Sequence, residues 1–297
     1  MATKQDKAEQ ARKAAAEAQA SIVEQIAKLR TDDGWRAYLE VVSRFHTYSL
    51  NNLMLILSQK PDAEFVAGYR KWLTLDHQVK KGEKGIRIFA PSAYTCKNDS
   101  CPDISKLGVD HKHMRFILVS VFDISQTEVV EGGTPIDTGA TRLTGEQGSD
   151  HLELLTERLH DAGYTISRDS IYPANGRTVP GKKIVLDNDL QPMMQLKTLI
   201  HETAHNVLGH VSEDTDYQSH RGLCETEAES VAYVVSSMLG IDTSDYSIKY
   251  VGAWAEGDIG LIESTAKRVI EAAAAIHAFI ADGVEPETME GVNAIAA

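Results

Sequence analysis

Residues 198–210 of the chain read TLIHETAHNVLGH, which contains the pattern H-E-x-x-H starting at His201. Residues four apart on an α-helix lie on one face about a turn apart, so His201 and His205 can reach one metal ion. Two imidazoles at this spacing are typical zinc ligands, and Glu202 between them is placed to act as a general base. The other positions are mainly apolar, which makes a buried polar cluster costly unless a metal is bound.

Whether this stretch is a metal site depends on a third ligand. The chain has eleven His residues, so the alternative is that the pattern arose by chance. His210 lies five residues beyond His205, roughly 140° further round a continuing helix, and is not expected to bind the same ion. The third ligand must therefore come from another segment.

The segment that best supplies this ligand is CETEAESVAYVV, residues 224–235, which is predicted to be helical. Glu225 and Glu229 are four apart and share one face, whereas Glu227 is expected to face solvent. We expect Glu225 to bind zinc and Glu229 to accept the ring N–H of a ligating His, although the reverse assignment stays open. The alternative is an acidic first turn that complements the helix dipole.

Within residues 165–240, IHETAHNVLGH and ETEAESVAYVVSSMLG resemble the ImmA/IrrE-type zincin peptidase domain, a family of cytoplasmic metallopeptidases. The resemblance implies that His201 and His205 bind zinc and that a glutamate of the downstream helix is the third ligand. It also implies that Glu202 is the catalytic base. The sequence departs from the family at Glu229, where Asn or Asp is common.

The N-terminal half is predicted to bind a ligand rather than to cleave one. From Arg44 to Phe89, eight basic residues stand against four acidic ones, a net +4 in a chain whose formal net charge is −13. Tyr48, Tyr69 and Trp72 are interleaved with them. Aromatic faces beside Lys and Arg favour single-stranded DNA, through stacking of about 1–3 kcal/mol per base and phosphate neutralisation. The alternative is that the aromatic residues are core and the lysines a solvated rim.

This half also resembles a known family. The stretches YSLNNLMLILSQKPDAEFVAGYRKWLTLDHQVKKGEKGIRIFAP and FILVSVFDISQTE, within about residues 35–130, are similar to the N-terminal domain of ArdC-like antirestriction proteins. The resemblance implies a domain that binds single-stranded DNA, joined to a C-terminal metallopeptidase domain, in a protein linked to mobile genetic elements. It implies DNA contacts by Asn51, Asn52, Trp72, Lys80, Lys81, Lys84 and Arg87.

Together these patterns predict an α+β protein with two domains, which suits a length of 297 residues. The second domain should be mostly helical with a small sheet. Its strand in residues 182–189, KKIVLDND, is expected to be the edge strand that pairs with an extended peptide. The predicted parts are a helical arm (1–31), a DNA-binding domain (32–130), a Gly/Thr/Pro-rich linker (131–148), a zincin domain (149–285) and a flexible tail (286–297).

Composition points to a protein of the cytoplasm without a membrane span. There is no signal-peptide pattern and no run of eighteen apolar residues, and three cysteines are too few for a disulfide scaffold. A second zinc site is the less favoured interpretation of the loosely spaced residues Cys96, Cys101, His111 and His113, which we expect to form a surface loop.

The predicted function is therefore a zinc-dependent peptidase joined to a module for single-stranded DNA. Two alternatives stay open. One is a non-catalytic protein that shields single-stranded DNA and holds a structural zinc. The other is a DNA-sensing protease that cleaves a repressor. The protein substrate cannot be inferred from the motif.

Overall fold

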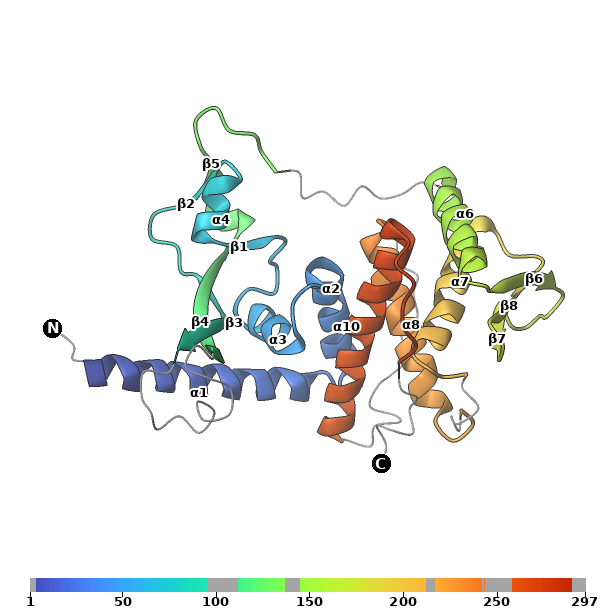
Figure 1. Ribbon diagram of the computed structural model, residues 1–297, viewed down its shortest axis with the longest axis horizontal. Coiled ribbons are helices and arrows are strands. Elements are labelled where there is room, and N and C mark those ends of the chain that lie inside the picture. The colour runs from blue at the N-terminus through green and yellow to red at the C-terminus, as the bar shows by residue number, and fades with distance from the viewer. Residues whose placement is uncertain are drawn as a thin grey trace. The chain divides into compact units, whose positions relative to one another are not determined.

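The computed structural model describes residues 4–95, 112–136, 145–211, 217–241, 243 and 258–289 (Figure 1). These residues form an α+β protein, as predicted. The chain divides into a first compact unit, Met1–Gln25 with Met54–Asp137, and a second, Ile26–Leu53 with Thr138–Ala297. The chain therefore passes from one unit to the other three times. None of the described helices is long and apolar enough to cross a membrane.

The first unit is built on short antiparallel sheets. Strand β4 (Lys112–Asp123) lies between β1 (Val66–Gly68) and β3 (Ile86–Thr95), and β2 (His77–Val79) pairs with β5 (Thr127–Val129). Strands β3 and β4 are the longest, with ten and twelve residues. The other three have only three residues each, which is too short for a period of two to be recognised.

Asp123, at the end of β4, ties this strand to the segment that precedes β1. Its buried carboxylate accepts the backbone N–H groups of Glu64 and Phe65 at 2.8 and 3.2 Å. It also accepts the backbone N–H and the hydroxyl of Ser125. Burial alone would raise the pKa of Asp123, but these hydrogen bonds outweigh it and lower the pKa below its ordinary value of 3.8.

Replacing Asp123 by alanine is expected to lower the free energy of unfolding by about 2–4 kcal/mol, because the partly buried N–H groups of Glu64 and Phe65 lose their charged acceptor. Since the folded pKa is depressed, this stabilisation is present above pH about 4 and is lost as the pH falls through the folded pKa. Urea unfolding at neutral and acid pH measures both effects. The matched control is Asp62→Ala, which removes an exposed carboxylate and should change stability by less than about 0.5 kcal/mol. If Asp123→Ala lowered the free energy of unfolding by the same amount at acid and at neutral pH, the charged form of Asp123 would not be the source of the stabilisation.

The second unit is mostly helical (Figure 1). Helices α7 (Pro192–Val207) and α8 (Arg221–Met238) pack against each other, and α10 (Ile259–Asp282) contacts both. Helix α6 (Gly145–Asp161), which begins within the predicted linker, packs on α7. Helix α2 (Asp32–Phe45) packs on α8. Helix α8 is thus covered on several sides, and most of its residues are buried.

Helix α2 is anchored in the second unit by two buried aromatic side chains. The indole N–H of Trp35 donates to Ser230 Oγ at 2.9 Å, and the hydroxyl of Tyr38 donates to the carbonyl of Ala266 at 2.6 Å. Buried Trp and Tyr contribute large apolar areas and find a partner for their polar tip. The predicted DNA-binding domain of residues 32–130 therefore spans a helix that belongs to the other compact unit.

A three-stranded sheet completes the second unit. Strand β8 (Lys183–Asp187) is central, parallel to β6 (Thr165–Asp169) and antiparallel to β7 (Gly176–Val179). The prediction that the strand in residues 182–189 forms the sheet edge is wrong, because β6 and β7 occupy both of its sides. Strand β7 is an edge of this sheet and packs on α7.

The second zinc site considered from the sequence falls mostly outside the described residues. Cys96, Cys101 and His111 lie there. His113, on β4, stacks on Tyr94 of β3 with ring centroids 5.3 Å apart.

Candidate metal centre and nucleic-acid interface

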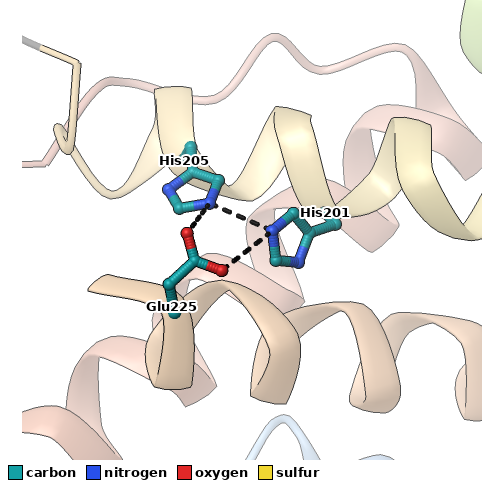
Figure 2. A group of neighbouring side chains, drawn as sticks. All are labelled: His201, His205 and Glu225. Carbon is teal, nitrogen blue, oxygen red and sulfur yellow. Dashed lines mark hydrogen bonds and ion pairs between the residues drawn. The ribbon is translucent and has the colours of Figure 1, made fainter. Parts of the chain in front are cut away.

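Helices α7 and α8 bring three metal-ligating side chains together (Figure 2). The Nε2 atoms of His201 and His205 are 3.1 Å apart. The oxygens of Glu225 lie 3.9 Å from His201 Nε2 and 3.8 Å from His205 Nε2. Ligands bound tetrahedrally to zinc at their usual distances are about 3.3 Å apart, so this donor set fits such an ion. The three side chains form a candidate metal site with room for a further ligand.

Glu229 lies on the opposite side of the His201 ring from these donors. Its Oε2 is 3.2 Å from His201 Nδ1, within ion-pair distance but without an aligned hydrogen bond, and its Oε1 is 3.1 Å from Lys197 Nζ. Burial alone would lower the pKa of His201, but Glu229, Glu202 and Glu225 raise it. Burial would raise the pKa of Glu229, which His201 and Lys197 lower. Glu225 thus faces the Nε2 atoms of His201 and His205, whereas Glu229 faces only Nδ1 of His201.

His210 and Glu227 lie behind His205. Because Gly209 takes a left-handed conformation after α7, the chain folds back, and His210 Nδ1 comes 2.9 Å from His205 Nδ1. His210 Nε2 is 2.9 Å from Glu227 Oε2. The prediction that Glu227 faces solvent is wrong: its side chain is 0% exposed and also pairs with Arg268, because α7 and α10 both pack on α8.

Glu202 is buried between α7 and β7. The Thr178 hydroxyl donates to its backbone carbonyl at 3.1 Å. A Cβ atom at Gly176 would lie 2.5 Å from Thr198 Cγ2 and 3.0 Å from Glu202 Oε1, so glycine permits this approach of strand and helix. Burial raises the pKa of Glu202 to about 7, although His201 and hydrogen bonds from Thr178 act in the opposite direction. A carboxylate with this pKa suits proton transfer near neutral pH.

Replacing Gly176 by alanine is expected to cost about 1–3 kcal/mol of stability, because the new methyl group forces β7 away from α7 and displaces Glu202. Gly68→Ala is the matched control, since its methyl group would meet no atom within 4 Å. Thermal unfolding of the two variants compares the effects. Equal shifts in Tm would show that the close approach at Gly176 has no special cost.

A cleft of about 700 Å³ opens over the three donors. Strand β7 lines one part of it. Another part is lined by Arg221, the first residue of α8, and by Tyr217, which lies in the turn before that helix. The Tyr217 hydroxyl donates to Glu225, and burial together with this bond raises the pKa of Tyr217, so the hydroxyl keeps its proton. Sequence reasoning missed Tyr217, because it precedes the helix in a turn and belongs to no motif.

The first unit carries part of the predicted nucleic-acid interface. Four basic residues of the predicted set have exposed side chains: Lys80, Lys81, Lys84 and Arg87. A groove of about 510 Å³ is lined by Lys80 and Lys81 together with Tyr69, whose side chain is 52% exposed. Tyr69 therefore offers an aromatic face beside two lysines, which favours stacking and phosphate contact, whereas Glu83 and Glu128 line the same groove and offset the charge of the lysines.

Trp72 cannot take the role predicted for it. It is fully buried, its ring packs against Phe65 and His77, and its N–H donates to the carbonyl of Phe122 at 2.9 Å. A base cannot stack on a buried ring, so this part of the prediction is wrong. The predicted residues Asn51 and Asn52, near the start of α3 (Leu50–Gln59), belong to the second unit rather than to the unit that carries the lysines.

The fold and the site define an α+β protein with a His–His–Glu candidate metal centre. Residues 12–122 match the family described as the N-terminal domain of anti-restriction factor ArdC. This part of the chain is similar to the ArdC N-terminal domain, so the resemblance to ArdC proteins stated from the sequence is confirmed. The resemblance of the C-terminal part to ImmA/IrrE-type peptidases stays a prediction.

Individual relatives are distant. The uncharacterized protein pXO2-81 of Bacillus anthracis is 24% identical over 267 residues, which are 78% of this chain and 45% of that protein, so the chain spans less than half of that relative. Crystal structures of the antirestriction protein ArdC from plasmid R388 are similar in a metal-free form (21% identity, TM-score 0.49) and an Mn(II)-bound form (19% identity, TM-score 0.45). Each comparison covers 82% of this chain and 98% of the ArdC chain.

Proposed function

We propose that the chain is a single-stranded-DNA-binding protein with a zinc-dependent peptidase centre, acting in the cytoplasm in antirestriction. The observation that carries the peptidase part is the joint placement of three metal donors and Glu202 at one cleft. Two His, one carboxylate and room for a further ligand are typical of hydrolytic zinc sites, whereas structural sites usually have four protein ligands. The match of residues 12–122 to the ArdC N-terminal domain supports the antirestriction part.

In this proposal His201, His205 and Glu225 hold the metal. A bound zinc ion supplies Lewis-acid chemistry, which polarises a peptide carbonyl and makes water more acidic. Glu202 takes a proton from the attacking water as the C–O bond forms, and returns it to the leaving amine as the C–N bond breaks.

The peptide substrate is expected to lie along β7. This strand is an edge of its sheet and lines the cleft, so an extended peptide can add to it through main-chain hydrogen bonds. Tyr217, on another wall of the cleft, holds the Glu225 carboxylate by a hydrogen bond. In this proposal the scissile peptide bond lies between the strand edge and the metal donors, within reach of Glu202.

The DNA-binding part rests on the exposed basic residues of the first unit. Exposed lysines neutralise phosphates, and each phosphate contact adds about 0.7 to the slope of log affinity against log salt for a single strand. The variant Lys81→Ala/Lys84→Ala should therefore weaken binding of an oligonucleotide and lower that slope by about 1.4. Lys13→Ala, which removes an exposed lysine of α1, is the control. Fluorescence anisotropy over a salt series measures both quantities.

The central test combines three measurements on the purified chain. Metal content is determined by mass spectrometry, and DNA binding by anisotropy. Proteolysis of unfolded protein substrates is followed through new N-termini, with and without single-stranded DNA. One zinc per chain together with cleavage that a chelator abolishes supports the proposal.

The same measurements separate the two alternatives. Zinc and DNA binding without any cleavage would favour a DNA-shielding protein with a structural metal. Cleavage that appears only when single-stranded DNA is added would favour a DNA-sensing protease that acts on a repressor. A preparation without metal under zinc-replete conditions would overturn the peptidase part and leave DNA binding as the function to pursue.

A further inference from the structure

A chain of buried polar groups runs from His205 into the core of the second unit. His205 Nδ1 lies 2.9 Å from His210 Nδ1, and His210 Nε2 lies 2.9 Å from Glu227 Oε2. Arg268 Nε donates to Glu227 Oε1 at 2.9 Å, and another nitrogen of Arg268 donates to the carbonyl of Leu208 at 2.7 Å. All four residues are buried: the exposed fraction is 5% for His205, 1% for His210, 0% for Glu227 and 7% for Arg268.

Local backbone structure explains why His210 reaches His205. After α7 the N–H of Gly209 donates to the carbonyl of Asn206, and that of His210 donates to the carbonyl of His205. With Gly209 at φ +70°, these two bonds form a Schellman motif. This motif commonly brings the second residue after the helix against its last turn through an apolar contact. Here the contact is made by two imidazole rings.

When the imidazole rings of His205 and His210 are both neutral and Glu227 is ionised opposite Arg268, these hydrogen bonds allow only one position for the N–H proton of each ring. Glu227 only accepts, so His210 must carry its proton on Nε2. His210 Nδ1 is then an acceptor, and His205 must donate from Nδ1. The lone pair of His205 is thereby fixed on Nε2, the atom that faces His201 and Glu225.

We propose that His210 and Glu227 are positioning residues that fix the tautomer and ring orientation of His205 for metal binding. This inference rests on the proposed metal site. Partners of ligating histidines orient the ring and raise its basicity. A buried ion pair such as Glu227–Arg268 is weak evidence for stability, because desolvation offsets its attraction. We therefore attribute the burial of this ion pair to its role in holding His210, and through it His205, in place.

The test measures zinc affinity by chelator competition and the visible spectrum of the cobalt-substituted protein. His210→Phe keeps a planar aromatic ring but removes both hydrogen bonds, and should lower zinc affinity about 10–100-fold and change the cobalt spectrum. His210→Asn, which can still accept a hydrogen bond from His205, should recover part of this loss. The control is Thr265→Val on α10, which removes a buried hydroxyl that makes no hydrogen bond among the described residues, and should leave both readouts unchanged.

A merely structural role predicts a different result. His210→Phe would then unfold at lower temperature but bind zinc with wild-type affinity and give the wild-type cobalt spectrum, which would overturn the proposal. If this variant does not fold, nitrogen NMR of the zinc-loaded wild type decides, because His210 must be protonated at Nε2 and His205 at Nδ1. Protonation of His210 at Nδ1 alone would overturn it. A wild type that binds no metal would instead refute the proposed metal site itself.

Discussion

Replacing Glu202 by glutamine is expected to slow peptide hydrolysis about 10²–10⁴-fold while metal content stays at that of the wild type. Glutamine keeps the size of the side chain, but its amide cannot take a proton from water. The three metal donors are other residues, so the ion should still bind. Initial rates on a substrate found by the proteolysis screen, together with metal analysis of the same samples, measure the two effects.

The pH dependence of wild-type hydrolysis provides a second test of Glu202. Burial raises its pKa to about 7, and the positive charge of a bound ion acts in the opposite direction. Because the base must be deprotonated, activity should fall as the pH decreases, with a midpoint at or below about 7. Glu263→Gln makes the same chemical change on the exposed side of α10 and should leave rate and profile unaltered. A Glu202→Gln protein with wild-type rates would exclude Glu202 as the base.

Replacing Glu225 by alanine is expected to remove most of the metal, whereas Glu229→Ala should retain it with about 10–100-fold weaker binding. Glu225 faces the Nε2 atoms of both His201 and His205. Glu229 instead approaches His201 at Nδ1 and is shared with Lys197. Metal content after dialysis against a buffered zinc concentration gives the stoichiometry, and chelator competition gives the affinity.

The two glutamates are each other's control, because they lie one turn apart on α8 and the substitutions are identical. Circular dichroism should show the same helix content for both proteins. Loss of metal in Glu229→Ala with retention in Glu225→Ala would exchange the two roles. Equal retention in both would mean that the third donor is another group, and Tyr217, which hydrogen-bonds to Glu225, would then be the next residue to test.

The periodicity of α7 was enough to predict much of this candidate site. Spacing alone places His201 and His205 on one face, and the same rule applied to the next helix puts Glu225 and Glu229 on one face. The rule failed for Glu227 because it assumes a helix with one solvated side. Helix α8 is covered by three other helices, so a polar residue away from the metal face is buried as well.

Other features could not be read from periodicity because they depend on chain reversal or on distant partners. His210 meets His205 only because α7 ends and the chain turns back at Gly209. Strand β7 has four residues, GRTV, with no apolar alternation, and is recognisable only beside β8. Trp72 lies among lysines in the sequence, but in the fold it packs against Phe65.

The threefold passage of the chain between its two units has a genetic consequence. Recombination within the Gly/Thr/Pro-rich linker (131–148) would give a downstream gene fragment that encodes most of the second unit but lacks α2. Its product would leave open the surfaces of α8 and α10 that Trp35 and Tyr38 now fill, and exposed apolar surface of this kind promotes aggregation. Exchange of modules at that point is therefore expected to be selected against, and the two units should be inherited together.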